Sequence, residues 1–398
     1  MDSRSFTSMT FKQIIAIPGL KTLLFTMLLS AMGFGIILPL LPFYALSLGV
    51  QPFELGMLTA TFALMSLLFS PFFGRLSDRI GRKKVLMIGT LGFTAAYLVF
   101  AFADSFLMAL IARALEGFFA AAIFPACISL LSDFTSHEQR GQAMGLMMMT
   151  FSVGFIFGPA LGGFASSFSV RDAFFLAAAA SFLNFVWILL KLKEPHEKAE
   201  SKHLPEKEAS LLSHLKTPLA FLFLSSTVIM LLIGGFEATL ALFVSEKLGF
   251  TAVEMGGVFT FVGVLMLIFQ PISGSLVNRF GEIRLVQAGL VFSGLGFFLI
   301  LFSTDWLTLL APLGLFVIGN SLVFPSVTSL LTKRVAGKQG AAIGLNQSSS
   351  SAGQIAGPLF GGFLYGINHL YSFLGLALVS WVYFFIFTFV AKPKLDKK

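Results

Sequence analysis

The stretch Pro71-Phe-Phe-Gly74-Arg-Leu-Ser-Asp78-Arg79-Ile-Gly81 recurs 200 residues later as Pro271-Ile-Ser-Gly274-Ser-Leu-Val-Asn278-Arg279-Phe-Gly281. Shorter matches keep the same offset along the chain, among them Phe124-Pro125 with Phe324-Pro325. Two glycine–proline runs of the same spacing, at 154–163 and 353–362, are related by an offset of 199. Agreement at so many positions indicates that the second half of the chain is a copy of the first.

The composition places both copies in a lipid bilayer. Hydrophobic residues make up 56% of the 398 residues and charged residues 12%, and the mean hydropathy is +0.89. Soluble domains carry about 25% charged residues, so a single soluble core could not hide this much apolar surface from water. A soluble enzyme, a disulfide scaffold, a fibrous repeat and a disordered chain are therefore excluded. The single cysteine, Cys127, also forbids an internal disulfide.

Nearly charge-free stretches long enough to cross the hydrocarbon, which takes about 20 residues, recur from residue 22 to residue 391. The predicted spans are 22–46, 55–73, 85–103, 106–131, 142–166, 172–191, 217–244, 254–277, 284–303, 306–331, 339–366 and 371–391. We expect an all-α integral membrane fold in which twelve helices form two parallel six-helix pseudo-repeats around a central cavity. The N-terminal half is expected at 1–192, a cytoplasmic linker at 193–216 and the C-terminal half at 217–398.

The distribution of basic residues predicts the orientation. All but three of the 27 Lys and Arg residues fall on the side of the N-terminus; Arg171 and Lys247 lie in loops on the other side, and Arg113 lies inside a span. Because cytoplasmic loops carry an excess of Lys and Arg, both termini are expected in the cytoplasm, with the protein in the cytoplasmic membrane. The net charge of +8 is then explained by the basic residues of the cytoplasmic segments, and no nucleic-acid partner is expected.

Three ionisable residues fall inside the spans away from the span ends: Arg113, Glu116 and Glu237. A charge costs about 2.5–3.5 kcal/mol at a helix centre on the insertion scale, which makes each a candidate for a functional role. Arg113 and Glu116 share one helical face, and they either bind protons or substrate or form a structural ion pair. Glu237 has no partner nearby in sequence. A carboxyl group isolated in hydrocarbon favours its protonated form, as a proton carrier requires; the alternative is a protonated acid in a helix–helix hydrogen bond.

The repeated stretch, extended to Arg82-Lys83-Lys84, resembles the loop signature of the major facilitator superfamily. The residues that match it, Gly74, Asp78, Arg79, Gly81, Arg82 and Lys83, are predicted to form a latch between spans 2 and 3 on the cytoplasmic side. The second copy has Asn278 in place of the acid, so the resemblance implies that the first copy is the working latch. The alternative is a basic loop that only sets topology.

Two further stretches resemble signatures of antiporters in that superfamily. Small residues four apart let helices pack backbone to backbone, although ordinary helix packing is an alternative for such a run. The residues that match the antiporter packing motif are Gly154, Gly158, Pro159, Gly162 and Gly163. In span 4, Ile111-Ala-Arg-Ala-Leu-Glu-Gly117 resembles the R-x-x-x-G signature of drug:proton antiporters, with Glu116 at a position where the family often has glutamine.

The Phe236-Glu237 pair resembles the Gram-positive multidrug exporters of the Bmr and NorA type. In those exporters the matching glutamate is associated with proton coupling and cationic drugs, and an aspartate lies near the position of Asn320, where this chain has none. Most of the 49 phenylalanines are expected to face lipid. Phe151 and Phe155, beside the glycine run, are candidates for a pocket that attracts cations through their ring faces.

The resemblance implies a proton-coupled antiporter that exports amphipathic, cationic organic compounds or drugs, by alternating access between its two halves. An exporter of a metabolite or sugar with the same fold is one alternative, and a membrane sensor or scaffold without transport is another. Phosphate-loop, zinc-protease and nucleophile-elbow motifs are missing from the sequence, so no enzymatic activity, metal or cofactor is expected. The expected partners are a small-molecule substrate, protons and the lipid bilayer, and the protein is expected to act as a monomer.

Overall fold

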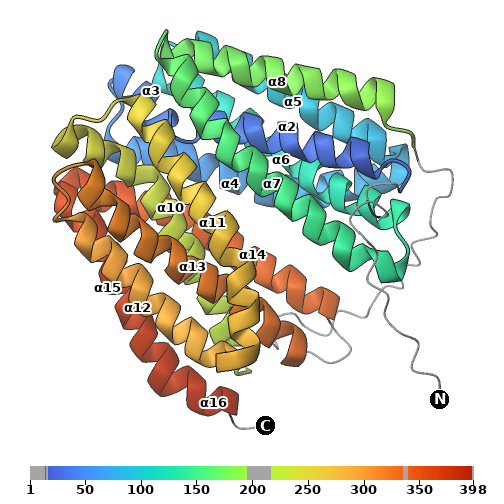
Figure 1. Ribbon diagram of the computed structural model, residues 1–398. Coiled ribbons are helices and arrows are strands. Elements are labelled where there is room, and N and C mark those ends of the chain that lie inside the picture. The colour runs from blue at the N-terminus through green and yellow to red at the C-terminus, as the bar shows by residue number, and fades with distance from the viewer. Residues whose placement is uncertain (1–13, 15–16, 195–216, 335–338, 397–398) are drawn as a thin grey trace, which may run out of the picture.

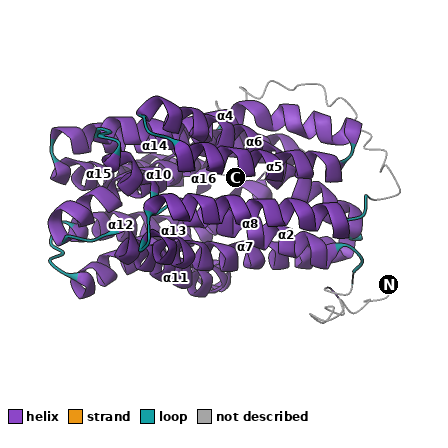
Figure 2. Cartoon of the chain, turned by 90° about the horizontal axis from the view of Figure 1, so that it is seen from above, coloured by secondary structure: helices purple, strands orange, loops and turns teal. Residues whose placement is uncertain are grey.

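The computed structural model describes residues 14, 17–194, 217–334 and 339–396, and its regular elements there are all helical (Figure 2). They are α2 (Leu20–Ile37), α3 (Leu41–Ser47), α4 (Pro52–Ile80), α5 (Arg82–Phe102), α6 (Phe106–Phe134), α7 (His137–Ser166), α8 (Val170–Lys191), α10 (Ala220–Leu248), α11 (Ala252–Phe280), α12 (Glu282–Ile300), α13 (Trp306–Arg334), α14 (Gln339–Ile367), α15 (His369–Ile386), η1 (Phe387–Ala391) and α16 (Lys392–Asp396). Within the described residues, eleven helical segments are long and apolar enough to cross a membrane. The 29-residue α14, which has the polar run Gln347–Ser351 in its first half, is the twelfth long helix, and the predicted all-α membrane fold is confirmed.

The helix boundaries repeat with the sequence. Both α6 and α13 contain 29 residues and begin 200 residues apart, as do α4 and α11. Helices α4 and α11 also begin with the same reciprocal cap. In α4, Glu54 Oε2 accepts a hydrogen bond of 2.8 Å from the backbone N–H of Gln51. In α11, Glu254 Oε2 accepts one of 2.8 Å from the backbone N–H of Thr251. Such a capping box satisfies backbone donors that the first helical turn leaves free.

Two predicted boundaries were wrong. The stretch that begins at Gly74 is not a loop, because α4 continues to Ile80 and α5 begins at Arg82. The chain reverses at the single residue Gly81, whose φ of 103° is one that glycine adopts without steric cost. The first span is also interrupted: α2 ends at Ile37, and α3, with a proline in its first turn, begins at Leu41.

The helices form two groups, which Figure 1 shows next to each other. Helices α2–α8 (blue to green) make up the N-terminal group, and α10–α16 (yellow to red) make up the C-terminal group. The groups meet mainly along two helix pairs, α4 with α14 and α7 with α11. The predicted linker falls largely at 195–216, outside the described residues.

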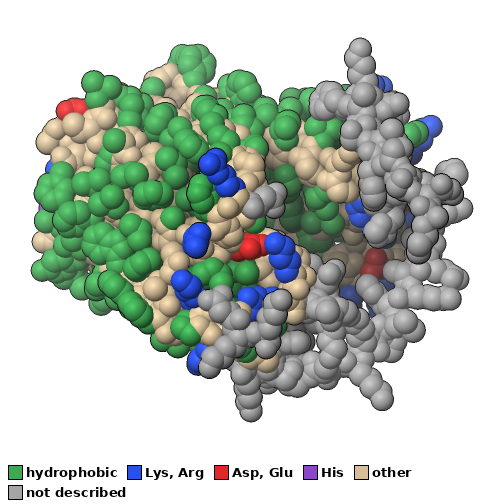
Figure 3. Space-filling view, turned by 60° about the horizontal axis from the view of Figure 1, so that its bottom comes forward, with side chains coloured by type: hydrophobic (Ala, Val, Ile, Leu, Met, Phe, Trp, Pro, Cys, Tyr) green, Lys and Arg blue, Asp and Glu red, His purple; other side chains and the backbone are tan. Residues whose placement is uncertain are grey.

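The two groups are in close contact at one end and apart at the other. Where α4 and α11 begin, a Cβ added to Gly56 would lie 2.4 Å from the carbonyl oxygen of Pro358, and one added to Gly256 would lie 2.6 Å from that of Pro159. Near the other ends of the same helices, a Cβ on Gly74 or Gly274 would meet no other part of the described chain within 4 Å. Figure 3 shows this second end hollowed between the groups, with Lys and Arg side chains around the hollow.

Candidate functional site

Glu237 lies on the wall of a cavity between the two groups of helices. The cavity and the open space at its mouth together amount to about 400 Å³. The cavity wall comes from α7 of the N-terminal group and from α10, α11 and α13 of the C-terminal group. The residues on the wall are Phe155, Ile233, Phe236, Glu237, Phe259, Val262, Met266, Phe316, Val317 and Asn320. Within the described chain Glu237 has no hydrogen bond or ion pair, and its side chain is only partly buried because it borders this space.

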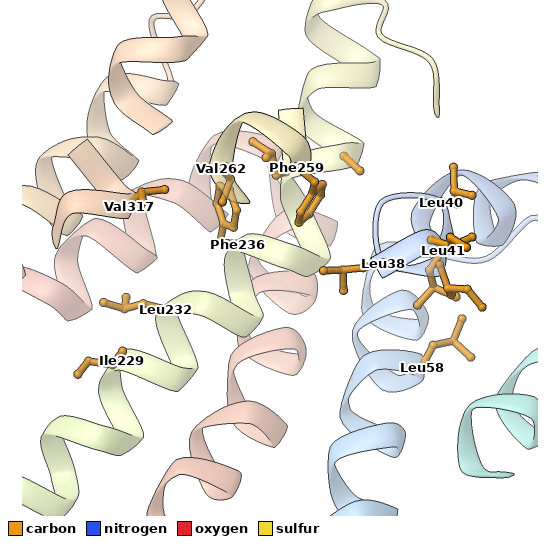
Figure 4. Packing of buried hydrophobic residues seen from close by; sticks show 14 of the residues in the cluster. Leu38, Leu40, Leu41, Leu58, Ile229, Leu232, Phe236, Phe259, Val262 and Val317 are labelled. Atoms are coloured by element: carbon orange, nitrogen blue, oxygen red, sulfur yellow. The ribbon is translucent and has the colours of Figure 1, made fainter. Parts of the chain in front are cut away.

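Four of the ten described residues on the cavity wall are phenylalanines. The rings of Phe236 and Phe316 lie 4.4 Å apart between centroids, and the ring of Phe259 lies 6.4 Å from that of Phe236. Figure 4 shows Phe236 and Phe259 close together beside Val262. A carboxyl group set among ring faces suits a lipophilic cation, since the rings attract the charge and the carboxylate neutralises it.

Arg113 and Glu116 form a buried ion pair in the first half of α6. The guanidinium Nη1 donates a hydrogen bond of 2.6 Å to Glu116 Oε2, and the side chains are 2% and 0% exposed. Helix α4 can approach closely at Gly117, where a Cβ would lie 2.4 Å from the carbonyl oxygen of Phe62. This approach brings the Phe62 ring to 4.9 Å from the guanidinium carbon of Arg113. Both the partner and the stacking ring of Arg113 are therefore fixed.

A short series of rings connects the ion pair with the cavity. The Phe62 ring that covers Arg113 lies 5.5 Å from the ring of Phe34, and Phe34 lies 6.4 Å from Phe155, which borders the cavity. Phe151 stacks on Phe155 at 6.4 Å but is not part of the described wall. The series of rings thus runs from the ion pair to the cavity that Glu237 borders.

The glycine run of α7 packs against helices on both sides. A Cβ on Gly154, Gly158 or Gly162 would lie 2.4 to 2.7 Å from a backbone oxygen of α2. On the other side, a Cβ on Gly163 would lie 3.2 Å from the Cα of Gly256 in α11. A Cβ on Gly256 would in turn lie 2.6 Å from the carbonyl oxygen of Pro159. The run therefore holds α7 against its own group and against the opposite group at once.

The residues predicted as a latch make contacts inside the N-terminal group. Arg82 forms an ion pair with Asp133 at the end of α6, and its Nη1 donates a hydrogen bond of 3.0 Å to the carbonyl oxygen of Ser129. Lys83 Nζ donates to the carbonyl oxygen of Leu189 in α8 at 2.9 Å. Asp78 is exposed and has no hydrogen bond or ion pair to the rest of the described chain. In this conformation the motif ties α5 to α6 and α8.

Sequence reasoning missed most of the cavity wall. Phe259 and Phe316 are two of the 49 phenylalanines, and composition does not separate a ring in a cavity wall from one that faces lipid. The repeat offered a signal for Phe316, because it corresponds to Glu116 at the offset of 200 and so occupies the same height in the opposite group. Asn320, one helical turn after Phe316, was noted only because the exporters that the chain resembles have an aspartate near this position.

Comparison with known proteins identifies the family. A family model described as the Major Facilitator Superfamily matches residues 23–285 and 222–398. The chain belongs to the major facilitator superfamily. Among its relatives, Multidrug resistance protein 1 of Bacillus subtilis (strain 168) is 32% identical over 373 residues, which cover 91% of this chain and 96% of that protein. Quinolone resistance protein NorA of Staphylococcus aureus (strain COL) is 27% identical over 366 residues, or 90% of this chain and 93% of NorA.

Two solved transporter structures have the same fold. The crystal structure of the nucleoside transporter NupG superposes with a TM-score of 0.81 at 15% identity and covers 94% of this chain and 99% of its own. The peptide transporter POT in complex with alafosfalin gives a TM-score of 0.78 at 18% identity, with coverage of 98% and 99%. These likenesses show a shared fold, and the chain is a multi-pass membrane protein.

Proposed function

We propose that this major facilitator protein is a proton-coupled antiporter that exports amphipathic, cationic organic molecules across the cell membrane. The observation that carries the proposal is the position of Glu237, a carboxyl group without a hydrogen-bond partner in the described chain, on a cavity wall of four phenylalanines. The multidrug resistance proteins among its relatives support the same class of activity.

Glu237 is the group that couples the entry of a proton to the export of the cation. As a carboxylate it neutralises the charge of a cation held between the rings of Phe236, Phe259 and Phe316. When a proton binds, the attraction disappears and the cation is released. Exchange of one proton for one monovalent cation moves no net charge across the membrane, so the proton concentration gradient, worth about 1.4 kcal/mol for each tenfold difference, drives the cation outward. Arg113 and Glu116 neutralise each other and contribute no net charge to the site.

Alternating access follows from the two ends of the molecule. The structure is closed where Gly56 and Gly256 contact the opposite group and is open at the end of Gly74 and Gly274. With both termini in the cytoplasm, as the basic residues predict, the open end faces the cytoplasm and the cavity is ready to take up substrate. Rocking of the groups about the cavity would then open the α4–α14 and α7–α11 contacts to the outside.

Efflux of a lipophilic cationic dye from bacterial cells tests the proposal. Cells that express the protein are expected to lose preloaded ethidium faster than cells without it. A protonophore should abolish the difference, because it removes the proton gradient without removing the protein. Efflux that persists with the protonophore would contradict proton coupling. A protein that exports no member of a panel of cationic dyes and antibiotics would contradict the substrate class.

A further inference from the structure

The cavity wall contains hydrogen-bond acceptors but no charged donor. Of the described residues on the wall, Glu237 and Asn320 have polar side chains and the others are apolar. These two polar groups border the same pair of rings, since Glu237 follows Phe236 directly and Asn320 lies one helical turn after Phe316. A ligand that packs on the Phe236–Phe316 ring pair, whose centroids are 4.4 Å apart, lies between an amide and a carboxyl group.

The amide of Asn320 is held with its oxygen free. Its Nδ2 donates a hydrogen bond of 3.0 Å to the carbonyl oxygen of Phe316, while Oδ1 has no partner in the described chain. The opposite orientation of the amide would place Oδ1 against that carbonyl oxygen, so the free group is the acceptor. Asn320 is 5% exposed, and a buried acceptor without a partner is unfavourable. Asn320 lies on the cavity wall but its Oδ1 is itself covered, so an N–H group in the cavity supplies the missing partner after a small movement of the side chains around the amide.

We propose that Asn320 Oδ1 accepts a hydrogen bond from the substrate, and that the cavity therefore prefers cations whose charged nitrogen carries a hydrogen to fully alkylated cations of the same skeleton. This inference rests on the proposed function and names its substrate class more narrowly. The carboxylate and the rings attract both kinds of cation, but only the protonated amine can also satisfy the amide oxygen. A site built to bind an N–H group discriminates against the analogue that lacks it, because the polar group is then left unpaired.

Acridine orange and its 10-methyl derivative form a suitable pair of probes, since protonation or methylation of the same ring nitrogen gives the same charge. Binding of each dye to the purified full-length protein is measured by fluorescence anisotropy, at a pH at which acridine orange is protonated. We expect the wild type to bind protonated acridine orange about tenfold more tightly than the 10-methyl dye, as one hydrogen bond to a charged group implies. Equal affinity in the wild type would overturn the inference without the use of any variant.

Variants at Asn320 assign the preference to its side chain. Asn320→Leu keeps the approximate size and removes the acceptor, and Asn320→Ala is the second variant in case the first does not fold. Either is expected to weaken binding of acridine orange about tenfold and to leave the 10-methyl dye unchanged. Ser321→Ala is the matched control, because Ser321 Oγ is also buried without a partner in the described chain but is not on the cavity wall. An equal loss for both dyes would overturn the inference.

Transport of the same dyes into proteoliposomes separates this inference from the proposed function. If the wild type binds acridine orange more tightly than the 10-methyl dye but transports neither, the inference stands and the proposed transport of these cations fails. If it transports both in a proton-dependent manner, with the same ratio in wild type and Asn320→Leu, the antiporter stands and only the role of Asn320 is refuted. A ratio that favours acridine orange in the wild type and disappears in Asn320→Leu supports both.

Discussion

Arg113 and Glu116 lie three residues apart in α6 and form an ion pair of 2.6 Å, with both side chains buried between helices. Buried pairs cost desolvation energy, and breaking one by removing a single partner costs more than replacing both, because a lone charge remains. Arg113 Nε has no partner in the described chain, and the buried hydroxyl of Tyr97 lies beside Glu116. The pair therefore neutralises Arg113 and leaves its Nε as an open hydrogen-bonding position.

The first prediction concerns this pair. Glu116→Gln keeps a hydrogen-bond acceptor for Arg113 but leaves the positive charge uncompensated, so transport should fall partly and the melting temperature in detergent should fall too. The double variant Arg113→Met, Glu116→Leu removes both charges and is expected to recover the melting temperature without recovering transport. A double variant as unstable as Glu116→Gln would show that the charge balance is not what stabilises this region.

The glycine run in α7 gives the second prediction. A Cβ on Gly158 would lie 2.7 Å from the carbonyl oxygen of Met32 and 2.8 Å from the Cα of Gly35. Because these are backbone atoms, even alanine forces α7 and α2 apart, and we expect Gly158→Ala to lose about 1–3 kcal/mol of stability and Gly158→Leu to abolish transport.

Gly145 in the same helix is the control, since a Cβ there meets nothing within 4 Å in the described chain. Gly145→Ala should leave dye transport unchanged. Normal transport by Gly158→Leu would show that the close approach of α7 and α2 is not required.

Hydropathy and the repeat predict the fold well because both depend on many residues at once. Twelve apolar stretches and a 200-residue offset were enough to expect two groups of six helices, and the family and fold are confirmed. The reversal at Gly81 could not be predicted in the same way, because α4 continues as a helix after the apolar stretch ends and the charged residues after Gly74 lie in its last turns.

The candidate site was only partly predictable. A charge in an apolar span is costly and therefore visible in the sequence, so Arg113, Glu116 and Glu237 were found, and the pairing of the first two follows from their spacing. The wall of the cavity depends on how α10, α11 and α13 pack, and a single phenylalanine such as Phe259 carries no sign of that packing. Whether Glu237 couples protons to transport stays a prediction.

The contact at the closed end gives the third prediction. Gly56 of α4 lies against the carbonyl of Pro358, and nearby the rings of Phe53 and Phe363 lie 6.5 Å apart between centroids on α4 and α14. Cysteines that replace both phenylalanines should be joined efficiently by a short bifunctional thiol reagent. Adding Gly56→Ala should lower the yield several-fold, because the methyl group prevents closure.

Gly74→Ala is the matched control for this experiment. It lies on the same helix, and its Cβ would meet nothing within 4 Å in the described chain. It should leave the cross-linking yield unchanged. If Gly56→Ala has the same yield as Gly74→Ala, this end does not close through the glycine contact.

The fourth prediction concerns Asp78, which has no partner in the described chain at the open end. If it acts as a latch when this end closes, Asp78→Asn should reduce transport several-fold while insertion into the membrane stays normal. The opposite change in the second copy, Asn278→Asp, should have a small effect. Protein expression and dye efflux measured in the same cells separate a loss of transport from a loss of membrane insertion. Equal losses would contradict a latch formed by the first copy alone.

The central claim is that Glu237 carries the proton, and substrate-evoked proton release in proteoliposomes tests it most directly. Glu237→Gln keeps the size and hydrogen-bonding capacity of the side chain but cannot bind and release a proton. Glu246→Gln is the matched control, because Glu246 lies on the same helix and accepts a hydrogen bond of 2.7 Å from Tyr365 away from the described cavity wall. With a cationic dye as substrate, wild type and Glu246→Gln should move protons when dye is added, and Glu237→Gln should fold but move almost none. Undiminished proton movement in Glu237→Gln would contradict the account and leave Glu116, buried in α6, as the next candidate proton carrier.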